Sequence, residues 1–377
     1  MKHRVVLSIL LVIALFTIVL SNKNILITSI AKVVIDFSSE VDIQTFEHEH
    51  FIVYYEAGQE NIISNISNLV ANIENEQEKW FPQFNIEKKL PIFLLSENHP
   101  LHAYYFENTK KGIYYVDLKL VFLNADTYAP ENNLVHEYGH YLLVEYINEN
   151  GGDEEQLPMW LKEGFANSFE WFVTNEVSES VWHYDPVPFS QLATVTNENR
   201  TAMYSQGFHA VLDFIHYNGY ERFRELLTIG NQFTSFSSAF EMITNIDYHT
   251  YHERFTYDRQ LSRYYHDLAK TNPEQLIVEA QAFLNEQPAV HPLTADITEL
   301  LYKVHQSIGN TTESLTLVRT VSSLTRNAYF LLDLAMAVGD HEPMLKARCI
   351  EKAIFYSKEA NLDQEHFLEQ IKKIAKS

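Results

Sequence analysis

Two histidines and a glutamate lie close together in the order His136, Glu137, His140 and form a His-Glu-x-x-His sequence. In a helix, residues four positions apart lie one above the other on the same face, so both imidazoles can reach one metal ion. Glu137 lies beside His136 around the helix, close enough to contact a metal-bound water. The spacing therefore predicts a site for zinc-dependent hydrolysis. By itself, the same pattern also arises by chance in a helix that carries two ordinary histidines.

The residues around this motif predict the helix that it requires. Apolar side chains recur at helical spacing through the segment, which gives the helix a surface to bury. Asn132 or Asn133, after Pro130, is expected to cap its start. Gly151 and Gly152 are expected to end it.

A catalytic zinc needs three protein ligands and one open coordination position. Glu163 is the candidate third ligand, because it lies early in a second expected helix that begins after Pro158. Leu161 and Phe165 belong to an apolar stripe at helical spacing, and Glu163 lies off that stripe. The chain after His140 is long enough for the first helix to end and for the second to pack against it.

The two predicted helices resemble a known family of enzymes. His-Glu-x-x-His followed by Pro-x-Trp-Leu-x-Glu-Gly-x-Ala is similar to the gluzincin zinc metallopeptidases, in particular the peptidase MA-like group. The resemblance covers residues 48–230. It implies that His136, His140 and Glu163 bind one Zn²⁺ and that Glu137 is the general base.

Two related classes of zinc peptidase have features that this sequence lacks. A metzincin would carry glycine at position 143 and a third histidine at position 146, where this chain has Leu143 and Tyr146. Gluzincin aminopeptidases carry a Gly-x-Met-Glu-Asn segment upstream, and none is present here. The first comparison excludes a metzincin, and the second weakens an exopeptidase interpretation.

Supporting residues are expected near the metal ligands. Asn167 lies one helical turn after Glu163, where it could orient a ligating histidine, although it could equally be an ordinary exposed polar residue. Tyr204 resembles a tyrosine that opens a later helix in related domains and could stabilise the oxyanion of the reaction. Packing is the alternative role for Tyr204. His183, Tyr184 and His209 are weaker candidates for the same task.

The distribution of strand and helix patterns predicts an α+β fold. A helix is expected over residues 60–80, and helical patterns dominate after residue 131. The resemblance implies a gluzincin, thermolysin-like catalytic domain with a small mixed sheet and a helical active-site lobe. It also implies that the edge strand above the zinc, either 112–116 or 118–123, pairs with an extended peptide. Four strands are expected, at residues 51–55, 91–95, 112–116 and 118–123.

The expected domain order is a linker at 25–47, a peptidase MA-like domain at 48–270 and an all-helical C-terminal region at 271–377. Turns at Gly309 and Gly339 divide this last region into short helices. Their spacing is similar to the period of tetratricopeptide-like helical hairpins, and an irregular helical bundle is the alternative. The C-terminal helices could hold a protein partner.

An uncharged, largely apolar run at residues 5–20 follows Lys2, His3 and Arg4. It predicts a signal anchor or transmembrane helix over residues 1–24. The protein would then be a single-pass protein of the cell membrane, with its catalytic domain extracytoplasmic in a bacterial envelope. Cleavage of the segment, which would give a secreted protein, stays open as an alternative.

The charge balance argues against a nucleic-acid partner. The chain carries 50 acidic and 28 basic side chains, a formal net charge of −22, and no basic run that would make a phosphate-binding patch. Its one cysteine, Cys349, excludes both an intrachain disulfide and a cysteine-based zinc site.

These features predict a membrane-anchored zinc metallopeptidase that acts on a peptide or protein. Two alternatives keep the same site residues. The domain could be a catalytically silent binding or sensory module, or it could be a zinc hydrolase of a non-peptide amide. An intact Glu137 argues against the silent module, because metal binding alone does not need it.

Overall fold

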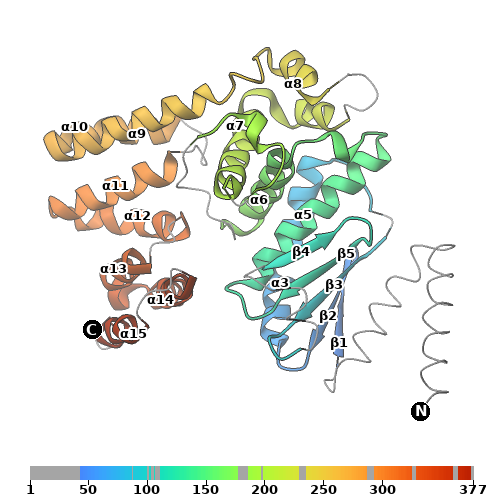
Figure 1. Cartoon of the computed structure of the whole chain (residues 1–377). Helices are drawn as coiled ribbons and strands as arrows, with labels where there is room; N and C mark the ends of the chain where they lie inside the picture. The colour runs from blue at the N-terminus through green and yellow to red at the C-terminus, as the bar shows by residue number, and fades with distance from the viewer. Residues whose placement is uncertain are drawn as a thin grey trace. The chain divides into compact units, whose positions relative to one another are not determined.

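The structure is a computed structural model, and it describes most of the chain beyond residue 42. Within the described residues the fold is mixed and mostly helical, with twelve α-helices and one small five-stranded sheet (Figure 1). The combination of strands first and helices later confirms the mixed α and β content expected from the sequence. The described ranges are 43–86, 88–99, 102, 106, 111–176, 186–196, 198–228, 235–286, 293–324, 328–359 and 364–374.

The chain divides into two compact units. The first contains the residues up to Glu74 together with Gln83–Glu145, and the second contains Asn75–Pro82 and Tyr146–Ser377. The sheet belongs to the first unit. Most of the helices belong to the second.

The sheet of the first unit is mixed, in the order β1-β2-β3-β5-β4. Strand β2 pairs in parallel with β3, and β3 pairs in parallel with β5, while β1 and β4 are antiparallel edge strands. The strands are β1 (Ile43–Glu47), β2 (Phe51–Glu56), β3 (Leu90–Leu95), β4 (Gly112–Tyr115) and β5 (Leu120–Asn124). Strand β1 thus occupies the last residues of the segment expected to be a linker.

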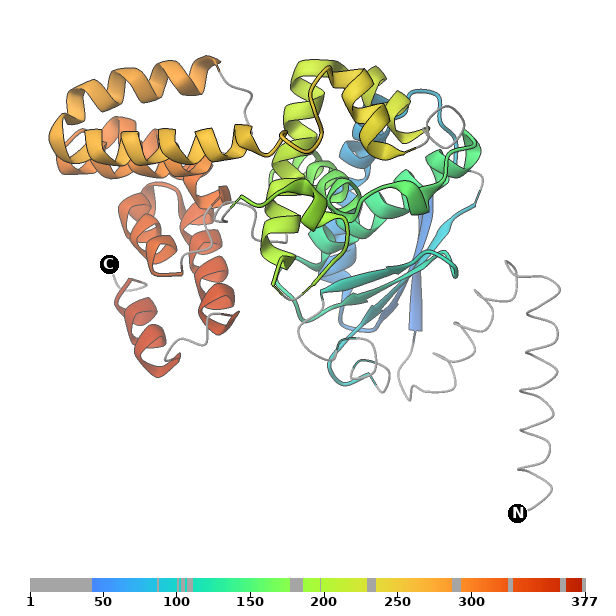
Figure 2. The same ribbon diagram turned by 45° about the horizontal axis from the view of Figure 1, so that its top comes forward.

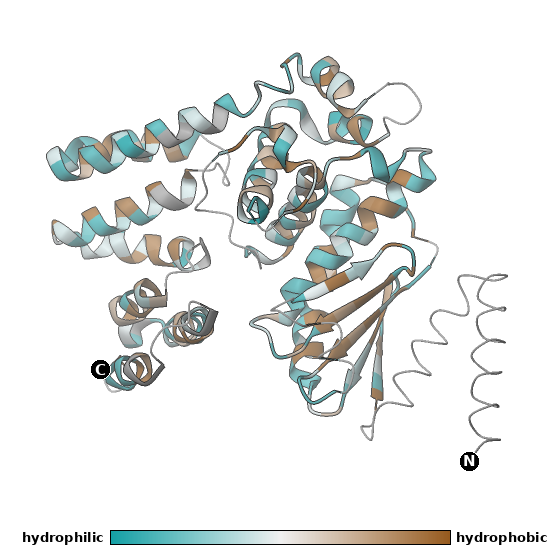
Figure 3. Ribbon diagram, in the orientation of Figure 1, coloured by the Kyte–Doolittle hydropathy of each residue, from teal (hydrophilic) through white to brown (hydrophobic). Residues whose placement is uncertain are grey.

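The central strands are apolar on both faces, as Figure 3 shows by their brown colour. On one face, Tyr54, Phe93 and Phe122 lie side by side across three strands, with ring centroids 4.8 and 5.4 Å apart. On the other face, Phe51 contacts Tyr138 of helix α5 (Pro130–Glu149). Burial on both faces explains why these strands are short apolar runs without strict alternation.

Of the two strands expected to form the exposed edge, the structure places β4 there and β5 inside the sheet. Both elements were expected from the sequence. Their order in the sheet was not, because hydrophobic pattern does not report which strand pairs with which.

Two helices that lie mostly in the first unit, α3 (Glu60–Trp80) and α5, pack on the same face of the sheet, as Figure 2 shows. Helix α5 begins at Pro130, after Ala129 with φ of 48°. The expectation that Asn132 or Asn133 caps the helix is therefore wrong. Both asparagines are buried inside the first turn, and Asn133 Nδ2 donates to Thr127 Oγ1 at 2.9 Å.

The second unit is helical throughout its described residues. Three short 3₁₀ helices, at Glu154–Gln156, Phe189–Leu192 and Gly339–His341, connect longer elements. The α-helices are α6 (Met159–Thr174), α7 (Arg200–Leu227), α8 (Phe236–Thr244), α9 (Glu253–Thr271), α10 (Pro273–Glu286), α11 (Thr294–Ser307), α12 (Thr311–Leu324), α13 (Ala328–Val338), α14 (Pro343–Glu359) and α15 (Gln364–Ile374).

The expected break near residue 272 is a helix boundary. Helix α9 ends at Thr271, and Pro273 starts α10. Leu268, Leu276 and Leu301 nevertheless belong to one buried apolar cluster, so α9, α10 and α11 pack together across this boundary. A second cluster, which includes Cys349, joins α12 to α15.

The expectation of a single-pass membrane protein is corrected. Among the described residues, no helix combines the length and the apolar character that crossing a bilayer requires. The segment at residues 1–24, on which that expectation rested, lies outside the described residues.

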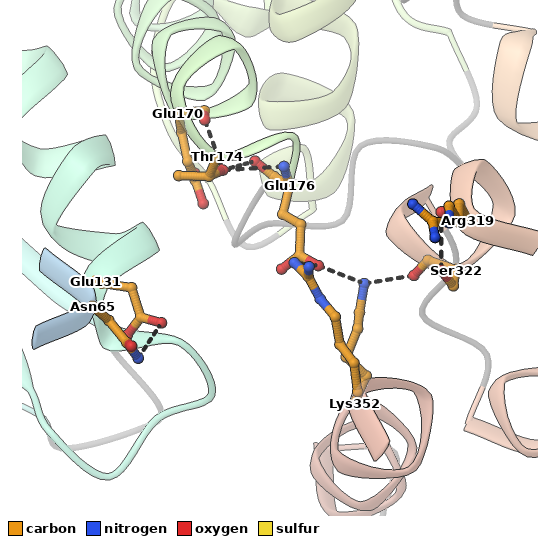
Figure 4. Close-up of polar contacts among 9 residues, drawn as sticks. Asn65, Glu131, Glu170, Thr174, Glu176, Arg319, Ser322 and Lys352 are labelled. Atoms are coloured by element: carbon orange, nitrogen blue, oxygen red, sulfur yellow. Dashed lines mark hydrogen bonds and ion pairs between the residues drawn. The ribbon is translucent and has the colours of Figure 1, made fainter. Parts of the chain in front are cut away.

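A buried charge network joins the end of α6 to the C-terminal helices (Figure 4). Glu176, whose side chain is 5% exposed, accepts from Arg348 Nη2 at 2.5 Å and lies 3.5 Å from Lys352 Nζ. Lys352, 3% exposed, also donates to the carbonyl oxygen of Ser322 at 2.7 Å. Removing Glu176 would leave the Lys352 ammonium buried without this carboxylate.

We expect Glu176→Ala to lower the free energy of unfolding by about 3–5 kcal/mol, because the Lys352 ammonium stays buried without its carboxylate. Urea denaturation measures the change. Glu225→Ala, which removes an exposed pair with Arg222, is the control and should show no detectable change. Equal effects of the two substitutions would contradict the buried network.

Candidate metal centre

Helix α5 brings the two histidines of the motif together. His136 and His140 lie one turn apart, with ring centroids 4.9 Å apart and the rings nearly perpendicular. His136 is buried and His140 is half-buried. Tyr138 and Leu142 are fully buried, so the opposite side of the helix is packed and its rotation about its axis is fixed.

Glu163 meets the two histidines as the sequence predicts. One ligand atom from each of His136, His140 and Glu163 lies within 4.8 Å of the others. Glu163 is 8% exposed and lies in the second turn of α6. Within the described part of the chain, this is the one group of three such side chains close enough to hold a metal ion.

The donor set fits a divalent metal ion. Two imidazole nitrogens and one carboxylate oxygen converge in a largely buried position, and these are ligand atoms that bind zinc in proteins. A metal ion bound by this cluster would compensate the charge of Glu163.

Glu137 is buried beside the cluster, with 8% of its surface exposed. It follows His136 directly in α5, so its carboxylate points to a different side of the helix from the two imidazoles. The next residue, Tyr138, is fully buried, and burial raises its pKa far above the usual range of a phenol. Tyr138 is therefore a neutral packing residue and not an acid of this site.

A close crossing of α6 and α7 determines where Glu163 lies within the second unit. A Cβ on Gly164 would stand 2.3 Å from the carbonyl oxygen of Gly207, and a Cβ on Gly207 would stand 2.3 Å from the carbonyl oxygen of Trp160. Only glycine at both positions allows the two helix backbones to approach this closely. This crossing was not predicted from the sequence, although Gly164 and Gly207 stand inside helical patterns, where a glycine often marks close packing.

The same crossing brings the two expected supporting residues together. Asn167 is fully buried and its Nδ2 donates to the carbonyl oxygen of Tyr204 at 3.4 Å. The alternative of an exposed polar residue at position 167 is therefore wrong. No described group donates to Asn167 Oδ1, which is a buried acceptor. Tyr204 is half-buried. Of the weaker candidates, His209 is fully buried, and His183 and Tyr184 lie outside the described residues.

Several acidic side chains of this region form ion pairs. Glu145 lies 2.5 Å from Lys119, and Glu154 lies 2.5 Å from Lys162. Both pairs are largely shielded from water. Each pair neutralises one acidic side chain of α5 or of the turn before α6, which the net charge of the sequence does not show.

No protein-family model matches the chain, and no curated protein has a matching sequence. The resemblance to gluzincins therefore stays a prediction from two motifs. What the cluster can do is inferred from its own donor atoms and from the residues around it.

We expect the wild-type chain to bind one Zn²⁺, used as the probe ion, and His136→Ala and Glu163→Ala to lose that ion after dialysis, because each substitution leaves two ligands. Atomic emission measures the stoichiometry. His216→Ala, which removes an exposed histidine, is the control and should retain the ion. Retention of zinc by Glu163→Ala would contradict the three-ligand cluster.

We expect Gly164→Ala to destabilise the protein by about 3 kcal/mol, because its Cβ meets the backbone of α7 and neither helix can yield locally. Thermal unfolding of the metal-free protein measures the loss. Ala166→Gly, a change of similar size on the same helix, should act only through helix propensity and cost about 1 kcal/mol plus the lost packing of one methyl group. An unchanged melting temperature for Gly164→Ala would contradict the close crossing.

Proposed function

We propose that this protein is a zinc-dependent metallopeptidase. The observation that supports this most strongly is the convergence of His136, His140 and Glu163 on one buried position, with Glu137 beside it. Two imidazoles and one carboxylate form the donor set of a catalytic zinc with an open fourth position. A purely structural zinc site would be closed by four protein ligands.

Zinc bound at this position would lower the pKa of a water molecule towards about 7 and polarise the scissile carbonyl. Glu137 takes the proton of the attacking water and then passes it to the leaving amine. Burial of Glu137 keeps its carboxylate close to the reacting atoms and away from competing solvent.

Asn167 is proposed to orient one of the ligating histidines. Its Oδ1 is buried without a donor among the described residues, and a ring N–H of a ligand histidine would satisfy it. Its amide Nδ2 donates to the carbonyl oxygen of Tyr204 at 3.4 Å, which leaves Oδ1 as the acceptor for that N–H. Tyr204 is proposed to donate a hydrogen bond to the oxyanion, as the resemblance implies.

Strand β4 is the proposed docking edge for an extended peptide. It is the terminal strand in the order of the described sheet, where it pairs with β5 on one side. Pairing along an edge gives affinity through the main chain and little sequence preference. A peptide or protein substrate is therefore favoured over a small amide, which cannot use the edge.

The finer assignment of the fold is proposed on the same basis. The mixed sheet and the pair of helices α5 and α6 are consistent with a gluzincin-type catalytic region. In the C-terminal part, α11 packs against α12 and α13 against α14, which supports a helical-hairpin arrangement similar to tetratricopeptide repeats. Such an array is suited to holding a protein partner.

We expect Glu137→Gln to retain zinc but to lower peptide hydrolysis at least about 10²-fold, because the amide cannot accept the proton. Release of fluorescent fragments from a peptide pool measures the rate. Glu131→Gln, on the first turn of the same helix, is the control, since Glu131 accepts from Asn65 Nδ2 at 3.1 Å and is not one of the proposed site residues.

The outcomes separate the proposal from its alternatives. Cleavage by Glu137→Gln at the wild-type rate would overturn the assignment of the general base. Bound zinc with no cleavage of any peptide by the wild type would favour a silent binding module. Cleavage of small amides alone would favour a non-peptide amide hydrolase.

A further inference from the structure

Alternate residues of strand β4 face helix α5. The ring of Tyr114 contacts the ring of Tyr141, with centroids 5.9 Å apart. Tyr115 instead contacts Phe122 on the opposite face of the sheet. Because side chains alternate along a strand, position 112 points to the same side as Tyr114, towards α5.

The steps of the strand and the helix then bring position 112 to Glu137. Two strand residues advance about 6.6 Å, and four helix residues advance about 6 Å. Moving back from Tyr114 to Gly112 therefore corresponds to moving back one turn on α5, from Tyr141 to Glu137. A side chain at position 112 would occupy the space that the Glu137 carboxylate uses.

The distances confirm this competition for space. A Cβ at position 112 would lie 2.9 Å from Glu137 Oε1, 3.0 Å from Glu137 Cγ and 3.0 Å from Leu123 Cδ2. Leu123 is fully buried and directly opposite Gly112 in the sheet register, so it cannot retreat. The strand backbone is also held, since Asn124 N donates to Lys111 O at 2.9 Å. Glu137 has the longer and more flexible of the two side chains, so we expect its carboxylate to be displaced first.

We propose that Gly112 is a positioning residue for Glu137: by lacking a side chain, it allows the carboxylate to lie against the edge strand, next to the proposed metal. This inference rests on the proposed function. It assigns to the edge strand a role besides binding substrate, namely fixing the place of the base. The spatial constraint itself does not depend on the reaction.

The contact is tested by thermal unfolding of metal-free protein, so that no effect passes through the metal. We expect Gly112→Ala to lower the melting temperature by about 2–4 °C in the wild type. The same loss should persist in a Glu137→Gln background, because glutamine has the same shape. It should be at least halved in a Glu137→Ala background, where Cγ and both carboxylate oxygens are absent. An equal loss in all three backgrounds would overturn the proposal.

The positioning role is tested by kinetics of the zinc-loaded protein. We expect Gly112→Ala to lower kcat about 10²-fold, the cost of displacing a catalytic group by about 1 Å, with KM within about twofold of wild type and zinc content unchanged. A merely destabilised protein would not show this lower kcat per folded, zinc-loaded molecule. Ile43→Val, on β1 at the other edge of the same sheet, is the control and should leave kcat unchanged.

The two measurements fail in different ways. An unchanged kcat for Gly112→Ala would overturn the positioning role even if the unfolding cycle shows the contact. A wild type that cleaves no peptide would overturn the proposed function, and with it the role of Gly112 in catalysis. In that case the unfolding cycle would still report whether Gly112 and Glu137 share the space.

Discussion

The close approach of α6 and α7 is the constraint on which the helical part of the site depends. Gly164 and Gly207 lie where the two helices cross. A Cβ on either glycine would collide with the backbone of the other helix. This proximity fixes the face of α6 that carries Glu163 and lets Asn167 reach the carbonyl oxygen of Tyr204. A larger residue at either position would separate the helices and move a metal ligand and its neighbour together, because both are on the same rigid helix.

An analogous constraint operates between β4 and α5. Tyr114 packs against Tyr141, two strand residues and one helical turn beyond Gly112 and Glu137. This aromatic contact fixes the alignment of β4 and α5 that places Glu137 beside Gly112. In both places a glycine leaves the space that a neighbouring helix or side chain occupies. The groups with chemistry are few, and the packing around them determines where they lie.

Local order was largely predictable. The helix that carries His136 and His140, the helix that carries Glu163, and the strands at residues 51–55 and 91–95 are all present. The start of α5 was misplaced, because asparagine is a good cap in general but Pro130 is itself able to begin a helix. Secondary structure depends largely on interactions between residues close in sequence, so residue types predict it well. The errors of such predictions are small shifts of an element boundary.

The sequence by itself determined the chemistry available: two imidazoles at the period of a helix, a carboxylate between them, and a second helix with Glu163 at a distance that allows a turn. Tertiary structure alone decided that Glu163 meets His136 and His140, that β4 and not β5 is the edge strand, and that Asn167 is buried. Helical periodicity is a property of adjacent residues and is therefore visible in sequence. Strand order and helix crossing depend on the fit of surfaces distant in the chain, which residue type does not encode locally.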